Sequence, residues 1–235
     1  MKYAKVFPNL GVIEFDPLKN FSEITHFFTT RQFGNMALHV ATTESNLRGA
    51  LVHRERACQT YAIDSNHLVT AQQVHGDRLV RVRPGMRGMG AKDYSQAIPD
   101  CDGLLTAYNQ VPLAIFVADC LPLYIYDYRN QAIALVHAGK KGTQLEIARK
   151  ALKMMEEEYQ TDPKKCLALL GPAIGPCCLD LDLYDLNRKQ LYQAGLMEEC
   201  IYSVDTCTSC ESQLFYSYRR EKEKAGRMMA LLMIK

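Results

Sequence analysis

Two histidines and one cysteine carry the clearest chemistry in this sequence. His75 lies in Gln-Val-His-Gly, Cys120 in Ala-Asp-Cys-Leu-Pro and His137 in His-Ala-Gly, and each follows a short apolar run that predicts a strand. Zinc takes imidazole nitrogen and thiolate sulfur in tetrahedral geometry, and three protein ligands leave a fourth position for water. The sequence therefore predicts a catalytic zinc site at the rim of a sheet, where the metal would lower the pKa of that water.

The wide spacing of these three residues leaves simpler interpretations open. A single histidine at a strand end is more often hydrogen-bonded than metal-bound, and a single cysteine often packs as a small apolar residue. A mechanism without metal would use Cys120 as a thiolate nucleophile and His137 as its base. Asp119, next to Cys120, could hold an imidazole in position, and Asp102 is the second candidate for that role.

The remaining cysteines belong to a chain that has nine in all. The N-terminus has no apolar signal segment, so we expect thiols or ligands rather than a disulfide framework. Cys177-Cys178 and Cys207-Thr-Ser-Cys210 could form a four-thiolate zinc site, but adjacent cysteines rarely bind one metal comfortably. We therefore expect Cys207 and Cys210 to be reduced and unlinked, with no zinc joining them to the adjacent pair. Packing roles are expected for the others, Cys58, Cys101, Cys166 and Cys200.

Several basic residues could bind an anionic group. Lys140 and Lys141 precede an expected helix, and a helix N-terminus with flanking lysines is a natural phosphate site. Further candidates are Arg31 and, near the C-terminus, Arg219-Arg220. The formal net charge is only +2, from 28 Lys+Arg against 26 Asp+Glu, so we expect no general attraction to nucleic acid.

The elements that must position these residues are mixed strands and helices. Apolar runs predict strands at 68–71, 113–118, 123–126, 132–136 and 167–170, the third and fourth joined by a hairpin turn. Helices are expected at 46–61, at 185–194, and from the capping box Thr143-Gln-Leu-Glu146 to about residue 161. Strands and helices do not alternate strictly, which favours a layered α/β (α+β) sandwich with a mixed sheet over a Rossmann fold.

The length of 235 residues and the hydrophobic content of 48% suit one domain of generous size, spanning residues 1–235, or two small ones. We find no repeat and no linker. No apolar run approaches the roughly 18–20 residues that cross a bilayer, so we expect a cytoplasmic protein without membrane contact. The Gly-rich stretch 84–90 is either a mobile loop over a site or a plain surface connection.

Eight motifs follow one another through most of the chain: Phe28-Thr-Thr-Arg31, Gln73-Val-His75-Gly76, Asp102-Gly103-Leu-Leu-Thr106, Ala118-Asp119-Cys120-Leu-Pro122, His137-Ala-Gly139, Gly171-Pro-Ala-Ile-Gly-Pro-Cys-Cys178, Thr206-Cys207-Thr208 and Phe215-Tyr-Ser-Tyr-Arg-Arg220. In order and number they resemble the laccase-domain family of bacterial multicopper-oxidase-like proteins, also called polyphenol oxidase or purine nucleoside phosphorylase. The resemblance implies a single α/β domain with zinc bound by His75, Cys120 and His137.

The resemblance also implies an activity. The enzyme would cleave adenosine, inosine, guanosine and methylthioadenosine by phosphorolysis, as a transferase, and would deaminate adenosine, as a hydrolase. The three metal ligands and Asp119 would form the catalytic centre, and the substrate and phosphate would be held by Arg31, Lys141 and His39. Purine nucleosides and phosphate would thus be its partners, and we expect a monomer or homodimer.

Alternatives come from earlier interpretations of the family, as a copper-dependent phenol oxidase or a Cys/His hydrolase of peptidoglycan precursors. The sequence lacks the several His-x-His pairs that a multicopper cluster needs, so zinc is favoured over copper. Three departures from the family pattern lie near the expected site: Lys140-Lys141-Gly142 for Trp-Arg-Gly, Gln32-Phe33-Gly34 after Arg31, and Ala37-Leu38-His39 for Ser-Leu-Asn. They bear on substrate preference and rate, and they leave room for an inactive zinc-containing interaction protein.

Overall fold

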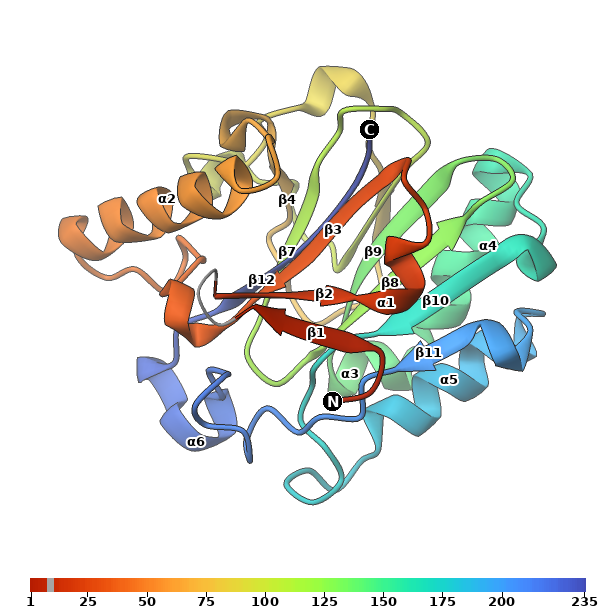
Figure 1. Ribbon diagram of the computed structural model, residues 1–235. Coiled ribbons are helices and arrows are strands. Elements are labelled where there is room, and N and C mark those ends of the chain that lie inside the picture. Colours follow the sequence, from red (N-terminus) through yellow and green to blue (C-terminus); the bar gives the residue numbers. More distant parts are fainter. Residues whose placement is uncertain (8–10) are drawn as a thin grey trace.

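Two six-stranded sheets form the centre of the computed structural model, which describes residues 1–7 and 11–235 (Figure 1). The first sheet has the order β1 (Ala4–Phe7), β2 (Val12–Phe15), β3 (Ile24–Thr29), β12 (Met228–Ile234), β7 (Leu113–Val117) and β4 (Val69–Thr70). The second has the order β11 (Ile201–Ser203), β10 (Cys166–Leu170), β8 (Leu121–Asp127), β9 (Ala132–Ala138), β6 (Gly103–Thr106) and β5 (Leu79–Arg81).

Both sheets are mixed. Most neighbouring strands are antiparallel, and the parallel pairs lie at sheet edges: β4 with β7, β10 with β11, and β5 with β6. The expected layered α/β sandwich is confirmed, with two mixed sheets at its centre. β8 and β9 form the hairpin that the sequence predicts, with Tyr124 opposite Leu135.

Alternation along the strands builds the layers. In β7, Leu113, Ile115 and Val117 face the core between the two sheets, whereas Ala114 and Phe116 belong to a second core on the outer face. A strand that is buried on both faces has a continuously apolar sequence, so apolar and polar residues do not alternate in this segment. The outer face of the first sheet is covered by α2 (Glu44–Gln59), and that of the second by α4 (Ile147–Tyr159) and α5 (Leu183–Gln193) (Figure 1).

The described residues also form three short α-helices: α1 (Asp16–Lys19), α3 (Lys140–Gln144) and α6 (Tyr218–Glu221). The predicted helices at 46–61 and 185–194 correspond to α2 and α5. Several strands near the two ends of the chain, including β12 between β3 and β7, were not predicted. Among the described residues, no helix is long and apolar enough to cross a membrane.

The predicted start of α4 is wrong. The helix begins at Ile147, and Glu146 precedes it in the left-handed region with φ 60°. Thr143 belongs to α3, and its hydroxyl accepts a hydrogen bond from Asn187 Nδ2 of α5 at 2.9 Å. A partner on another helix thus replaces the local capping bond that the sequence pattern predicts.

The Gly-rich stretch 84–90 is fixed against the first sheet. Buried Arg54 of α2 donates hydrogen bonds to the carbonyls of Gly90 and Ala91, at 3.0 and 2.7 Å. The Thr70 amide of β4 donates to the Met89 carbonyl at 2.9 Å. These bonds support the surface-connection interpretation of this stretch, because its carbonyls are held by the sheet and the helix.

Candidate active site

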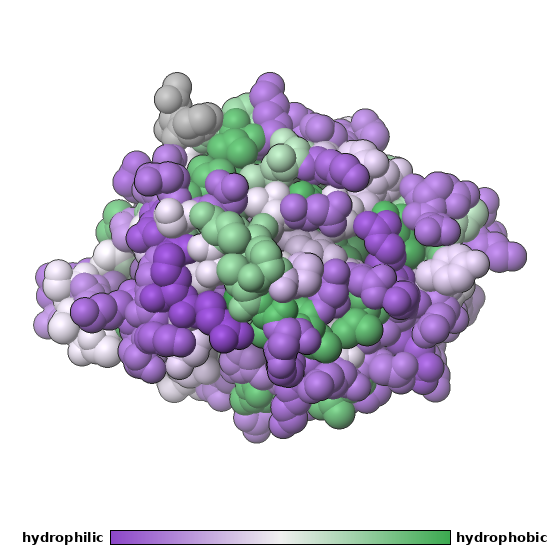
Figure 2. Space-filling model, turned by 90° about the horizontal axis from the view of Figure 1, so that it is seen from below, coloured by the Kyte–Doolittle hydropathy of each residue, from purple (hydrophilic) through white to green (hydrophobic). Residues whose placement is uncertain are grey.

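A cavity of about 610 Å³ is lined by His75, Cys120 and His137 together with residues from other segments of the chain. Its walls come from the segment after β4, the turn between β7 and β8, the loop that leads to α5, and the region of α6. α3 and α6 lie toward the lower side of the molecule in Figure 1. Figure 2 shows that side, where apolar residues gather near the middle and hydrophilic residues surround them.

Strand pairing brings Cys120 and His137 together. Cys120 directly precedes β8, His137 lies near the end of β9, and the register pairs Pro122 with His137. One potential ligand atom from each of His75, Cys120 and His137 lies within 4.8 Å of the other two. A Cβ atom on Gly139 would lie 3.0 Å from Cys120 Sγ and 3.1 Å from His75 Cδ2, so a glycine at this position leaves room for these two side chains to approach each other.

Gln73 anchors the segment that carries His75. Its Nε2 donates to the Phe116 carbonyl at 2.9 Å, and its Oε1 accepts from the Phe116 amide at 2.8 Å. The side-chain amide therefore pairs with the backbone of β7 as a neighbouring strand would. Sequence reasoning missed this role, although Gln73 stands inside the Gln-Val-His motif.

Asp102 joins the two histidines. Its Oδ1 accepts from His137 Nδ1 at 2.7 Å and from the His75 amide at 2.9 Å, while its Oδ2 accepts from the Gly76 amide at 2.7 Å. A carboxylate on Nδ1 directs the Nε2 atom of His137 away from it and fixes the tautomer that can bind a metal. Burial raises the pKa of Asp102, but the hydrogen bond and charge of His137, together with the hydrogen bonds from the Gly76 and His75 amides, outweigh burial and hold this pKa below its ordinary value.

Asp119 does not take the imidazole-positioning role that the sequence suggested. It lines the cavity, but its carboxylate accepts from Thr208 Oγ1 at 2.7 Å, Ser217 Oγ at 3.0 Å and the Arg219 amide at 2.6 Å. It therefore ties the turn before Cys120 to the loops that follow β11. Among the described hydrogen bonds, Asp102 is the carboxylate that holds an imidazole, which confirms the second candidate.

The electrostatics of the pair favour a charged thiolate. Burial raises the pKa of the Cys120 thiol, but the charge of His137 and hydrogen bonds with both histidines lower it to about 6. Burial lowers the pKa of His137, whereas the Cys120 thiolate and Asp102 raise it to about 9. A divalent cation could replace the shared proton, because metal ligands bind in their deprotonated forms.

The cavity is also basic. Its lining includes four cationic side chains, Lys140, Arg219, Lys222 and Arg227. His39 lies there as well, and burial, with Arg227 and Arg54 nearby, lowers its pKa to about 4 and keeps it neutral. Arg227 was missed by sequence reasoning, and it directly precedes the apolar run of β12.

Two of the residues expected to hold phosphate are not among the described residues that line the cavity. Arg31 Nη1 donates to Glu221 Oε1 and to the Ser212 carbonyl, both at 2.9 Å, and its guanidinium lies over the Tyr216 ring. Lys141 is exposed on α3. Of the three residues expected to hold substrate and phosphate, only His39 lines the cavity. Lys140 lines it instead of Lys141.

Most of the chain, residues 25–181 and 179–235, matches one family model, described as multi-copper polyphenol oxidoreductase laccase. The chain belongs to this family. It is 33% identical to the purine nucleoside phosphorylase YlmD of Geobacillus stearothermophilus, over 84% of this chain and 82% of that protein. It is 31% identical to YlmD of Bacillus subtilis, also named a purine nucleoside phosphorylase, over 92% and 91% of the two chains.

Solved structures agree with this membership in the laccase family. The crystal structure of YlmD from Geobacillus stearothermophilus superposes with a TM-score of 0.93 at 30% identity and covers 99% of both chains. The crystal structure of the Bacillus licheniformis hypothetical protein YfiH gives a TM-score of 0.94 at 30% identity and covers both chains completely. This chain therefore shares its two-sheet architecture with both of these solved structures.

The donor set of this laccase-family site suits one metal ion. Two imidazoles and one thiolate converge, and Asp102 supports one of the imidazoles from behind, as expected for a three-ligand catalytic site. The described residues contain two groups that could hold a metal ion, and only this one includes histidine. A multicopper centre draws on more histidines than these two.

Proposed function

We propose that this chain is a zinc-dependent purine nucleoside phosphorylase that also deaminates adenosine. The observation that carries the proposal is a single cavity in which the group formed by His75, Cys120 and His137 faces four cationic side chains. A metal site alone fits many hydrolases, whereas phosphorolysis needs a site for the phosphate anion as well. The names of the relatives supply the reaction class, and the substrates would be adenosine, inosine, guanosine and methylthioadenosine.

Each part of the cavity has a role in this proposal. Zinc held by the three ligands would supply a Lewis acid there. Arg219 and Lys140 would bind phosphate, in place of the expected Arg31 and Lys141, and orient it toward C1′ of the ribose. As the bond from C1′ to the base breaks, its electron pair moves onto the purine, and nearby cations stabilise that charge.

The apolar wall of the cavity would hold the base. Ile174, Leu179 and Leu183 line one side, and the ring of Phe116 lies among the lining residues. A purine can stack on such a ring and bury its faces against aliphatic side chains. For deamination, water adds at C6 of adenine and ammonia leaves, so phosphate takes no part. We propose that the whole chain, residues 1–235, acts as one cytoplasmic domain on these small molecules.

A second candidate is a Cys/His hydrolase without metal. The lowered pKa of Cys120, next to His137, favours it because a thiolate beside an imidazolium is a nucleophile ready for acyl transfer. Metal content separates the two candidates, since a thiolate shared with stoichiometric zinc is a poor free nucleophile.

The test combines metal analysis with product analysis. Purified protein is incubated with adenosine, with and without phosphate, and the products are separated by chromatography. We expect free base and ribose 1-phosphate only with phosphate, inosine under both conditions, and loss of all products in His137→Ala together with its zinc. Native zinc content in His137→Ala, or no release of base with phosphate, would contradict the proposal.

A further inference from the structure

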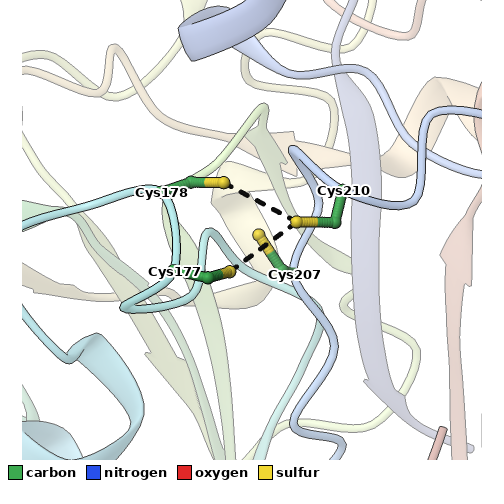
Figure 3. A group of neighbouring side chains, drawn as sticks. All are labelled: Cys177, Cys178, Cys207 and Cys210. Atoms are coloured by element: carbon green, nitrogen blue, oxygen red, sulfur yellow. Dashed lines mark hydrogen bonds between the residues drawn. The ribbon is translucent and has the colours of Figure 1, made fainter.

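Four cysteines from two distant segments meet on the surface beside the cavity (Figure 3). Cys177 and Cys178 lie in the loop between β10 and α5, and Cys207 and Cys210 lie in the segment after β11. All four Sγ atoms lie within 4.8 Å of one another. Cys210 Sγ is 3.6 Å from the Sγ atoms of both Cys177 and Cys178.

We propose that these four cysteines bind a second zinc ion in a four-thiolate site. Zinc–sulfur bonds are about 2.3 Å long, so neighbouring sulfurs of a regular tetrahedron lie about 3.8 Å apart. The observed 3.6 Å is close to that edge. A disulfide would need about 2.0 Å, and one sulfur cannot be shared equally between two disulfide partners as Cys210 is between Cys177 and Cys178.

The fold removes the objection that adjacent cysteines bind one metal poorly. The Gly175 carbonyl accepts hydrogen bonds from the amides of Cys178, at 3.0 Å, and Leu179, at 3.1 Å. The chain therefore makes a tight turn at the adjacent pair, and both thiols approach Cys210 from different directions (Figure 3). The expectation drawn from the sequence considered the pair without this turn.

Backbone contacts hold the two segments in register. Ala173 and Cys207 form a parallel bridge, and the Thr208 amide donates to the Ala173 carbonyl at 3.0 Å. A Cβ on Gly175 would lie 3.3 Å from Cys207 Cβ and 3.5 Å from Cys177 Sγ. The four thiols are thus placed by rigid backbone, as a metal site requires.

Zinc at this site would stabilise the loops that form one wall of the cavity. Ile174 and Leu179, on either side of the adjacent cysteines, line the cavity. The Ile174 amide donates to the Asp119 carbonyl at 2.8 Å, and Thr208, next to Cys207, donates to the Asp119 carboxylate. Four protein ligands leave no open position, so this zinc would stabilise the wall and take no part in the chemistry.

The experiment measures metal content by mass spectrometry on protein purified under reducing conditions. We expect about two zinc ions per chain, falling to about one in Cys210→Ser and in Cys177→Ser, because each substitution removes one of four ligands. Cys200→Ser, which changes a half-buried cysteine outside the cluster, is the matched control and should keep both ions. His137→Ala should lose the zinc ion bound with His75 and Cys120 and keep the one in the cysteine cluster, so the two sites can be emptied separately.

Cobalt substitution tests the site first in the unmodified chain, where no substitution can disturb folding, and then in two variants. Thiolate-to-cobalt charge-transfer absorption reports the number of bound thiolates, and it should correspond to a four-thiolate site in addition to a single-thiolate site. The signal should remain largely intact in His137→Ala and disappear largely in Cys210→Ser. The proposal is overturned if Cys210→Ser holds as much zinc as Cys200→Ser, or if thiol counting finds disulfides or four free thiols in the native cluster.

Discussion

Replacement of Asp102 by asparagine tests the support of the candidate metal site. The carboxylate is buried and accepts four hydrogen bonds, from His137 Nδ1 and from the amides of Val74, His75 and Gly76. Asparagine offers one oxygen and one NH₂ group. In either orientation, the NH₂ group therefore faces donors that Asp102 satisfies at present.

The magnitude follows from those contacts. If the amide oxygen takes the place of Oδ1, the amides of Val74 and Gly76 face NH₂ and lose their acceptor. If the side chain flips, the NH₂ group takes the place of Oδ1 and the His75 amide loses its acceptor. Nδ1 of His137 must then accept from this NH₂ group and stay unprotonated. The imidazole proton therefore lies on Nε2, the atom that a metal would need. A buried donor without a partner costs about 1–3 kcal/mol. We expect Asp102→Asn to lower the free energy of unfolding by about 2–4 kcal/mol and the zinc affinity by roughly 10–100-fold.

Urea denaturation and competition with a chelator measure these two quantities. Asp100→Asn is the matched control. It makes the same chemical change two positions earlier in the sequence, at an exposed residue. It should stay within about 0.5 kcal/mol of the unmodified chain. If Asp102→Asn behaves like this control in both assays, Asp102 does not position the histidines and our account of the site is wrong.

Three further predictions address other parts of the molecule. Burial lowers the pKa of His26 to about 4, so the unfolded chain takes up the proton first as the pH falls below about 6.5; this should cost about 3 kcal/mol of stability at pH 4. His26→Gln should reduce the difference between urea midpoints at pH 7 and pH 4, whereas His67→Gln, at an exposed position, should not. Gly139→Ala should displace Cys120 and His75 by a few tenths of an ångström and reduce bound zinc in metal analysis, and full zinc occupancy would contradict the crowding argument. Arg219→Ala should raise the phosphate KM by roughly 10–150-fold, which corresponds to about 1.5–3 kcal/mol for a charged hydrogen bond, and should leave deamination nearly unchanged. Lys141→Ala, outside the cavity, is its control, and equal effects of the two variants in steady-state kinetics would refute the assignment.

The sequence by itself determined the elements whose signal is local. Apolar runs such as 113–118 located central strands, because a strand buried on both faces must be apolar throughout. The metal-binding candidates were also visible, since only a few side chains offer nitrogen or sulfur to zinc, and His75, Cys120 and His137 each follow such a run.

The tertiary structure decided which residues support or surround those candidates. Asp102 rather than Asp119 holds the imidazole, because the pairing of β6 with β9 sets Gly103 opposite Val136. Arg31 forms an ion pair with Glu221, 190 residues away in the sequence, and it does not line the cavity where we expected it to bind phosphate. Neither outcome has a local signal, since both depend on strand register and on loops far apart in the sequence.

The adjacent cysteines Cys177 and Cys178 are another case in which the local sequence does not indicate how side chains are arranged in the fold. Their spacing argued against a shared metal, yet a turn at Gly175 and a parallel bridge between Ala173 and Cys207 bring four sulfurs together. Spacing along the chain describes ligand geometry only where one short segment supplies the ligands. Where two loops supply them, backbone hydrogen bonds between the loops set the distances, and these are a property of the folded chain.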